Sequence, residues 1–391
     1  MTAPAEILQA LHLRAMEFTQ VRRDIHRHPE LAFDEHRTSA LVAEKLDAWG
    51  YQVARGLGGT GVVGTLARGP GKRKLGLRAD MDALPIHETT GKDYASSHAG
   101  LMHACGHDGH TAMLLAAAEY LARHGKFSGT LNLIFQPAEE GAGGAVKMME
   151  DGLFDKHPCD AVFAMHNMPG FDAGKLVFRE GATMASSDNV SITLTGVGGH
   201  GALPHLTADP IVAASSIVMA LQTVVSRNVD PMQAAVVTVG AINAGKANNV
   251  IPPSAQLELS VRALDREVRV RLEQRIKALV HAQAESYSVK AEVNYKRGYS
   301  VLVNTAAETE FARKIGVELV GEAGVIRNGP ALTGSEDFAF MLEKLPGSYL
   351  FIGNGGGAGS CMVHNPSYDF DDTNIPIGAA YWVCLAQKFL T

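Results

Sequence analysis

Three histidines, a cysteine and an aspartate fall within the eight residues from His103 to His110. Imidazole and thiolate groups are ligands that zinc and related transition metals favour. Cys105 and His107 are separated by one glycine, so both side chains can turn toward a single ion. A surface loop with Asp108 as a helix cap is the plain alternative. Because so short a segment cannot close a metal site, we expect further ligands elsewhere in the chain.

Other acidic and imidazole side chains stand directly after apolar segments that have the pattern of strands. They are Asp80 and Asp82 after 75–79, Glu139 and Glu140 after 131–135, and His166 after 161–165. In open α/β sheets, ligands gather beyond the carboxyl ends of the strands. Taken singly, each group is better explained as a turn cap, a helix start or a buried histidine. Together with the cysteine and histidine cluster, they predict one shared site.

The elements that must position these residues follow from hydrophobic periodicity. Helical and near-continuous apolar strand patterns alternate over the first 180 residues. This alternation predicts an α/β fold with a largely parallel sheet covered by helices. From about Asn189 to Arg297 the order becomes strand, helix, strand, strand, helix, strand, which predicts an inserted ferredoxin-like α+β domain. We therefore expect a catalytic domain in two segments, 1–185 and 299–391, and an inserted domain at 186–298.

Composition narrows the class of protein. The chain has 391 residues and a formal net charge of −6, which opposes a nucleic-acid-binding surface. The N-terminus lacks a basic region followed by an apolar stretch, and the apolar run Ile211 to Leu221 is too short to cross a membrane. The four cysteines are widely spaced, so a disulfide framework is a poor explanation. We expect a cytoplasmic enzyme without nucleic-acid or membrane partners.

Two glycine-rich segments resemble nucleotide-binding loops without their context. Gly56 to Gly61 matches the dinucleotide fingerprint, but a strand pattern follows where a helix is required, so we predict a turn. Gly353 to Gly359 lacks the lysine and hydroxyl residue of a phosphate loop, and we interpret it as a loose connecting loop before His364.

Six motifs together resemble one known family. They are His-Ala-Cys-Gly-His-Asp-Gly-His-Thr at 103–111, Gln-Pro-Ala-Glu-Glu-Gly at 136–141, Gly-Gly-His-Gly-Ala-Leu-Pro-His at 198–205, Asn-Val-Ile-Pro at 249–252, Gly-Ser-Glu-Asp-Phe at 334–338 and His-Asn-Pro-Ser-Tyr-Asp-Phe at 364–370. The chain resembles the hippurate hydrolase, aminoacylase and auxin-amino-acid-conjugate hydrolase group of co-catalytic metallo-amidohydrolases, from about residue 20 to the C-terminus. This resemblance implies a zinc-peptidase-like catalytic domain and a lid domain that also dimerises.

The family pattern also implies roles for individual residues. It implies that each subunit binds two divalent metal ions, which are zinc, manganese, nickel or cobalt. The five ligands it implies are Cys105, His107, Glu140, His166 and His364, with Cys105 as the bridge. It makes Glu139 the general base. Neighbouring residues of extended chain point to opposite sides, which also suggests different roles for Glu139 and Glu140. Related carboxypeptidases have His-x-Asp where this chain has Arg78-Ala79-Asp80, so the identity of the metal stays open.

The resemblance implies hydrolysis of the amide bond of N-acyl amino acids, such as hippurate or N-acetyl compounds, by a metal-activated water. His200 resembles a family histidine that supplies an oxyanion donor across a homodimer interface of the lid. Asn249 and Arg262 resemble lid residues that hold the substrate.

Three alternatives remain. One is a metallo-dipeptidase or carboxypeptidase of the same superfamily. The others are a thiol amidase with Cys105 as nucleophile and a non-catalytic metal-binding protein. The adjacent pair Glu139 and Glu140 at a strand end disfavours both of these, because neither needs a second carboxylate there.

Overall fold

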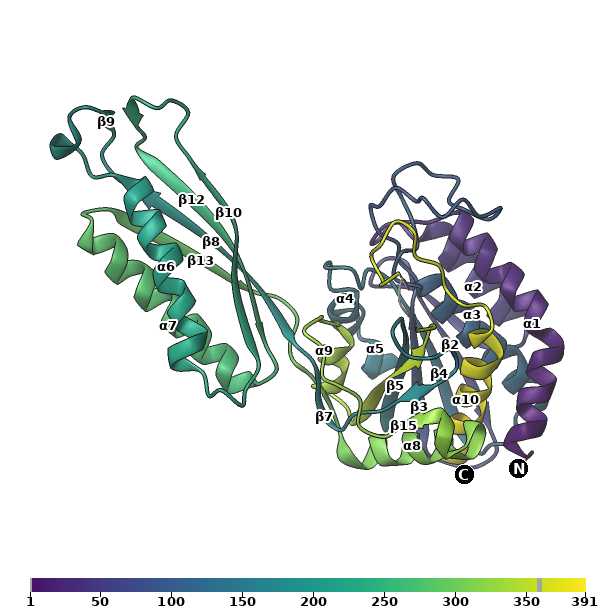
Figure 1. Cartoon of the computed structure of the whole chain (residues 1–391). Helices are drawn as coiled ribbons and strands as arrows, with labels where there is room; N and C mark the ends of the chain where they lie inside the picture. The colour runs from purple at the N-terminus through teal and green to yellow at the C-terminus, as the bar shows by residue number, and fades with distance from the viewer. Residues whose placement is uncertain (1, 357–360) are drawn as a thin grey trace. The chain divides into compact units, whose positions relative to one another are not determined.

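The chain forms two units, which the computed structural model describes over residues 2–356 and 361–391 (Figure 1). The first unit contains the residues up to Gly181, Val303–Pro330 and Asp337–Thr391. The second contains Ala182–Leu302 and Ala331–Glu336. Each unit has its own hydrophobic core.

An eight-stranded sheet with the order β1-β2-β4-β3-β5-β16-β6-β15 is the centre of the first unit. The four middle strands β4, β3, β5 and β16 are mutually parallel, whereas β1, β2 and β6 pair antiparallel with their neighbours toward the middle. The prediction of a largely parallel α/β sheet is confirmed for this centre. The strands are β1 Gln52–Leu57, β2 Gly61–Arg68, β3 Lys74–Asp80, β4 Gly129–Gln136, β5 Ala161–Met168, β6 Leu176–Val177, β15 Val325–Ile326 and β16 Gly347–Gly353.

Helices cover the sheet, as the apolar strands require. Leu75, Leu77 and Ala79 of β3 belong to the core shared with the helices α1, α3 and α10, while Arg78 faces the other side, where α9 lies. The helices of this unit are α1 Pro4–Arg27, α2 His36–Ala48, α3 His107–His124, α4 Gly144–Glu150, α5 Leu153–Lys156, α8 Ala306–Val320, the 3-10 helix η2 Glu322–Gly324, α9 Phe338–Leu342 and α10 Asn374–Phe389.

The glycine-rich segment at 56–61 is a hairpin turn, as predicted. It joins β1 and β2, and Gly56, Gly58 and Gly59 have positive φ angles that suit glycine. The strand before it, β1, is absent from the sequence prediction because its residues form no continuous apolar run and all but Leu57 are at least partly exposed. The second glycine-rich segment, 353–359, lies partly outside the described residues.

The second unit has the predicted ferredoxin-like topology. Its four-stranded antiparallel sheet has the order β10-β12-β8-β13, with two helices in the connections. Its elements are β8 Ser186–Thr195, β9 Gly199–His200, η1 Pro204–Leu206, α6 Pro210–Asn228, β10 Ala235–Ala244, β11 Val250–Ile251, β12 Ser254–Ala263, α7 Arg266–Ser286 and β13 Lys290–Arg297. Two further strands, β7 Gly181–Met184 and β14 Leu302–Asn304, pair where the chain passes between the units.

Helix α6 contains the apolar run Ile211 to Leu221. Among the described residues it is the one helix whose length and mean hydropathy of 1.3 would allow it to cross a membrane. Core helices of soluble proteins have the same properties, and Ala213, Ile217 and Leu221 of α6 are buried in the core of the second unit. All four cysteines are free.

Candidate active site

The metal-ligand candidates Cys105 and His107 lie where the chain turns into α3. Gly106 between them has a φ of 89°, a left-handed conformation that glycine adopts at little cost. This turn lets two near-neighbours in the sequence face the same space. Both side chains are buried.

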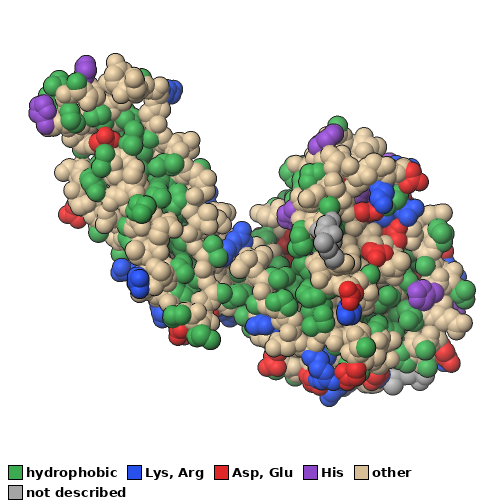
Figure 2. All heavy atoms as spheres, viewed as in Figure 1, with side chains coloured by type: hydrophobic (Ala, Val, Ile, Leu, Met, Phe, Trp, Pro, Cys, Tyr) green, Lys and Arg blue, Asp and Glu red, His purple; other side chains and the backbone are tan. Residues whose placement is uncertain are grey.

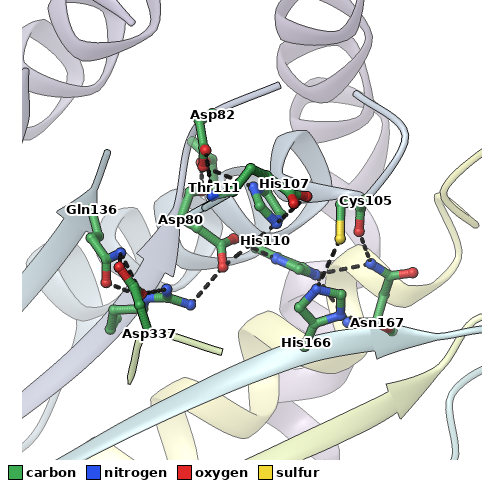
Figure 3. Close-up of polar contacts among 12 residues, drawn as sticks. Asp80, Asp82, Cys105, His107, His110, Thr111, Gln136, His166, Asn167 and Asp337 are labelled. Carbon is green, nitrogen blue, oxygen red and sulfur yellow. Dashed lines mark hydrogen bonds and ion pairs between the residues drawn. The ribbon is translucent and has the colours of Figure 1, made fainter. Parts of the chain in front are cut away.

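His107 is held from one side by a carboxylate. Its Nδ1 lies 3.1 Å from Asp82 Oδ1 (Figure 3), while its buried Nε2 makes no hydrogen bond to any described residue and lies 3.8 Å from Asp80 Oδ2. The other oxygen of Asp82 accepts the backbone N–H of Glu140 at 2.9 Å. Asp82 therefore links the ligand candidate His107 to the backbone of Glu140 and leaves Nε2 of His107 for an ion. This is the usual arrangement of a metal-ligating histidine.

His166 at the end of β5 shows the same arrangement. Its Nδ1 donates to the carbonyl oxygen of Asn167 at 2.5 Å, and its Nε2 lies 3.3 Å from Cys105 Sγ. The neighbouring His110 differs, because both of its ring nitrogens are engaged. Nδ1 bonds Asp80 Oδ1 at 2.6 Å, and Nε2 accepts the backbone N–H of Asn167 at 2.9 Å. His110 therefore braces the site and is not available as a ligand.

Glu139 and Glu140 lie in a turn after β4, and the expectation that they point to opposite sides is wrong. Oxygen atoms of both carboxylates and a ring nitrogen of His107 lie within 4.8 Å of one another. The chain is not extended here, since Ala138 has a φ of 55° and turns the backbone. The buried Glu35 stabilises this turn, because its Oε1 accepts the Ala138 N–H at 2.8 Å.

His364 reaches the same place from the C-terminal segment. Its backbone N–H donates to the carbonyl oxygen of Ala104 at 2.7 Å, and its Nε2 lies 3.2 Å from Glu140 Oε1. Its φ of 66° is uncommon for a residue other than glycine. Unlike Cys105, His107 and His166, its side chain is about half exposed, at 51%.

The donor set fits divalent transition metals. Ligand atoms lie within 4.8 Å of one another in each of two groups, Cys105 with His107 and His166, and Cys105 with Glu140 and His364. Cys105 belongs to both groups. Among the described residues, His107 Nε2 has no hydrogen-bond partner, and Glu140 Oε1 has only ion pairs with His364 Nε2 and His107 Nε2, which is costly for buried atoms unless another group satisfies them. Sulfur, imidazole and carboxylate ligands together suit zinc, manganese, cobalt or nickel.

The charges around these ligands are strongly coupled. Burial raises the pKa of the Cys105 thiol well above its ordinary value, and the carboxylates of Glu140 and Glu139 raise it further. Burial alone would lower the pKa of His107, but the carboxylates of Asp80, Asp82 and Glu140 raise it to about 10. Burial and the neighbouring His110 lower the pKa of His166 well below its usual range. The excess of buried carboxylates makes this site attractive to cations.

A second buried network braces the start of α3. Asp108 Oδ2 lies 2.8 Å from His26 Nδ1 and 3.4 Å from an Arg22 nitrogen, both on α1. Arg22 also bonds Asp372 at 2.8 Å. The interpretation of Asp108 as a simple helix cap is wrong, because Gly106 occupies the cap position.

In the second unit, the structure places His200 and Asn249 side by side. Strands β9 and β11 pair there, and Asn249 accepts the backbone N–H of Gly201 at 2.8 Å. Both side chains are exposed. The Ala202 N–H donates to His200 Nδ1 at 3.0 Å, so the ring proton of neutral His200 is on Nε2.

Arg262 is not brought to this pair. It is the last residue but one of β12, at the opposite end from the β9 and β11 pairing, and a ten-residue strand spans roughly 30 Å. Its guanidinium donates to Ser335 Oγ at 2.9 Å. His200 and Arg262 of one chain therefore cannot touch the same small substrate.

Sequence reasoning missed a buried polar network behind the ligands. Arg78 bonds Gln136 at 2.8 Å, Asp80 at 2.5 Å and Asp337 at 3.1 Å. Gln136 also donates to Asp337 at 2.8 Å. The signal available was an arginine inside an apolar strand, which requires buried acidic partners.

Comparison with known proteins decides the family. Residues 76–388 match the model of peptidase family M20/M25/M40. The chain belongs to this family. Across 374 residues it is 47% identical to the hippurate hydrolase of Campylobacter jejuni, covering 96% of this chain and 97% of that protein. It is 42% identical over 371 residues to the N-acetyl-L-cysteine deacetylase of Bacillus subtilis, covering 95% and 87%.

Solved structures of the family have the same fold. A dinuclear metal-binding M20 peptidase of Bacillus subtilis matches this chain with a TM-score of 0.83 and 32% identity, covering 98% of this chain and 99% of that one. The M20 assignment confirms the resemblance seen in the six sequence motifs.

Proposed function

We propose that this M20 protein is a metal-dependent amidohydrolase that cleaves N-acyl amino acids to a carboxylic acid and a free amino acid. The observation that carries the proposal is the convergence of Cys105, His107, Glu140, His166 and His364 around the base candidate Glu139. The names of the hippurate hydrolase and the N-acetyl-L-cysteine deacetylase support the substrate class. Residues 1–185 and 299–391 would together form the catalytic domain, and residues 186–298 would form the lid.

Two divalent cations held by the five ligands would polarise the scissile carbonyl and lower the pKa of a water molecule toward neutrality. The Glu139 carboxylate takes the proton of the attacking water and later gives it to the departing amine nitrogen, which is a poor leaving group without it. Asp82 and the carbonyl oxygen of Asn167 hold His107 and His166 in place during these steps.

The chemistry of Cys105 supports a ligand role over the thiol amidase alternative. A nucleophilic cysteine needs a lowered pKa, because the thiolate is the reactive form. Burial and two adjacent carboxylates raise the pKa of Cys105 instead, so a thiolate here needs a bound cation to stabilise it, which a metal ligand has and a metal-free nucleophile lacks.

A substrate panel tests the proposed function. Benzoyl, acetyl and indoleacetyl derivatives of several amino acids, together with simple dipeptides, are assayed with manganese, zinc, cobalt and nickel. We expect release of the free amino acid from N-acyl compounds only by metal-loaded protein. Faster cleavage of dipeptides would favour the dipeptidase alternative. An acyl group trapped on Cys105 in metal-free protein would establish the thiol amidase.

We also propose that the enzyme is a cytoplasmic homodimer, or a larger assembly of dimers, joined through its second unit, and that His200 donates to the oxyanion in the partner's site. The Nε2–H of His200 is exposed and oriented by the Ala202 bond. Large apolar side chains are exposed on the same unit, among them Leu206, Met219 and Val250. Figure 2 shows hydrophobic side chains on the surface of this unit. Asn249 beside His200 would contact the same partner substrate, whereas Arg262 would bind the substrate of its own chain.

Mixed dimers test this sharing. Chains carrying His200→Ala and Glu139→Gln are refolded together in equal amounts, so that about half of the dimers are hybrids. If His200 acts across the interface, each hybrid has one intact site, and about a quarter of all sites should work. If each chain uses its own His200, every site keeps one lesion. Absence of complementation despite proven exchange of subunits would refute sharing.

A further inference from the structure

Asn167 at the end of β5 is fully buried, and the chemistry proposed above uses only its backbone carbonyl. Its side chain makes two short hydrogen bonds. Nδ2 donates to the carbonyl oxygen of Cys105 at 2.6 Å (Figure 3), and Oδ1 accepts from the Tyr368 hydroxyl at 2.6 Å. Nδ2 also lies 3.0 Å from His110 Nε2.

The orientation of this amide is fixed by its partners. The carbonyl oxygen of Cys105 can only accept a hydrogen bond, so the nitrogen of the amide must face it. The oxygen then faces Tyr368, whose hydroxyl donates. A side chain without a hydrogen-bond donor at this end could not bind the backbone of Cys105.

Asn167 joins three segments that carry metal-ligand candidates. Its side chain contacts the loop with Cys105 and the segment that follows His364, in which Tyr368 lies. Its own backbone follows His166. Through its backbone N–H it also bonds His110 on α3.

The Asn167 side chain is tightly packed against its neighbours. A Cβ atom on Gly106 would lie 2.2 Å from Asn167 Nδ2 and 2.5 Å from the Tyr368 hydroxyl oxygen. The amide is therefore pressed against the backbone between Cys105 and His107. Any change in its position moves the bridge candidate relative to His166 Nε2, which is 3.3 Å from the Cys105 sulfur.

We propose that the Asn167 side chain is a positioning residue that holds Cys105 in the orientation required for bridging, and that it thereby sets the metal affinity. The proposal rests on the ligand roles in the proposed function. Residues that orient metal ligands typically change metal affinity or activity by about 10-fold to 100-fold when mutated. Tyr368 supports Asn167 from the other end, and its removal should have a smaller effect in the same direction.

Cobalt titration tests the proposal, because thiolate bound to Co²⁺ gives a charge-transfer absorption that reports on the bond to Cys105. Metal-stripped parent, Asn167→Leu and Tyr368→Phe proteins are titrated, and hydrolysis of an N-acyl amino acid is measured in parallel. We expect Asn167→Leu to raise the Co²⁺ dissociation constant about 10-fold to 100-fold and to alter the absorption band. Excess Co²⁺ should restore much of kcat, with little change in the KM for substrate.

Asn304→Leu is the matched control. Asn304 is also a buried asparagine in the first unit, whose Nδ2 donates to the Tyr349 carbonyl at 2.8 Å and whose Oδ1 accepts the Tyr349 N–H at 2.7 Å. It should lose stability but keep the Co²⁺ affinity of the parent. A similar loss of affinity in Asn304→Leu would show that general destabilisation explains the result and would overturn the proposal.

Parent-like affinity and absorption in Asn167→Leu would also overturn it. If that variant does not fold, Tyr368→Phe decides, since it removes one hydroxyl and must still weaken Co²⁺ binding. Failure of the proposed function is distinguishable, because the parent would then bind Co²⁺ without hydrolysing any N-acyl amino acid.

Discussion

The predicted site residues of the two units differ in how firmly the protein holds them. Cys105, His107 and His166 are buried, and their hydrogen bonds with Asp82 and Asn167 brace them. His200 and Asn249 are exposed, and a single backbone N–H orients the His200 ring. The first arrangement is preorganised for charge, whereas the second is suited to meeting another surface. Mutations of these braced ligand candidates should therefore affect metal binding and stability, and mutations at His200 should affect turnover alone.

The largest effect should come from the base candidate. Glu139→Gln should lower kcat by roughly 10²-fold to 10⁴-fold, because a carboxamide cannot accept the proton of water. Its metal content should stay near that of the parent. Glu140→Gln should instead lower metal occupancy, measured by elemental analysis after gel filtration. If the two phenotypes are exchanged, the base and the ligand have been assigned in reverse.

His200→Ala should reduce kcat by about 10²-fold, which corresponds to about 3 kcal/mol for the loss of one oxyanion donor. Its melting temperature should equal that of the parent, since the side chain is exposed. His205→Ala is the control, because His205 is an exposed histidine of the neighbouring η1 segment. Equal loss of kcat in both variants would remove the special role of His200.

Buried charge in the first unit should appear as pH-dependent stability. Burial would lower the pKa of His26, but Asp108 and Glu88 raise it to about 9. Because the folded pKa lies above the unfolded value of about 6.5, the contribution is complete below about pH 6.5 and is lost as the pH rises through about 9. This difference corresponds to at most about 3 kcal/mol.

Urea unfolding of the parent and His26→Gln, with a chelator present, measures this contribution. The stability advantage of the parent should shrink between about pH 6.5 and 9.5. An advantage that stays constant over this range would show that His26 is not charged in the folded protein.

The smallest effect concerns the turn after β4 that carries Glu139 and Glu140. Ala138 has a φ of 55°, which costs an L-residue about 1 kcal/mol or more. Ala138→Gly relieves that strain but increases the entropy of the unfolded chain, so stability should rise by less than about 1 kcal/mol. Ala138→Val should destabilise, because a β-branched residue tolerates this conformation poorly. Equal loss of stability in both variants would show that the backbone angle does not limit this position.

The sequence was sufficient to find the ligand candidates because their side-chain types are rare in combination. Cys105 and His107 stand beside a glycine at a helix start, and Glu140 and His166 follow apolar strands, so the topology of a parallel sheet brings them together. The alternation of helix and strand patterns likewise predicted both folds.

The bracing residues could not be predicted in the same way. Asn167 and Arg78 have side chains that occur in many structural settings, and only the packing shows what they bind. The turn at 137–140 was misjudged because Ala138 adopts a left-handed conformation without being glycine. Such a conformation depends on tertiary contacts, here the bond from the Ala138 N–H to Glu35.

The strand order has a consequence for biosynthesis. Strand β5, which carries His166, pairs with β16, and β16 is made of residues 347–353. The residues of the second unit are all synthesised between these two strands. On the ribosome, the second unit can therefore fold while one edge of β5 is still unpaired, since domains generally fold as units during synthesis. We expect the metal site to be among the last parts of the nascent chain to form, because His364 emerges later still.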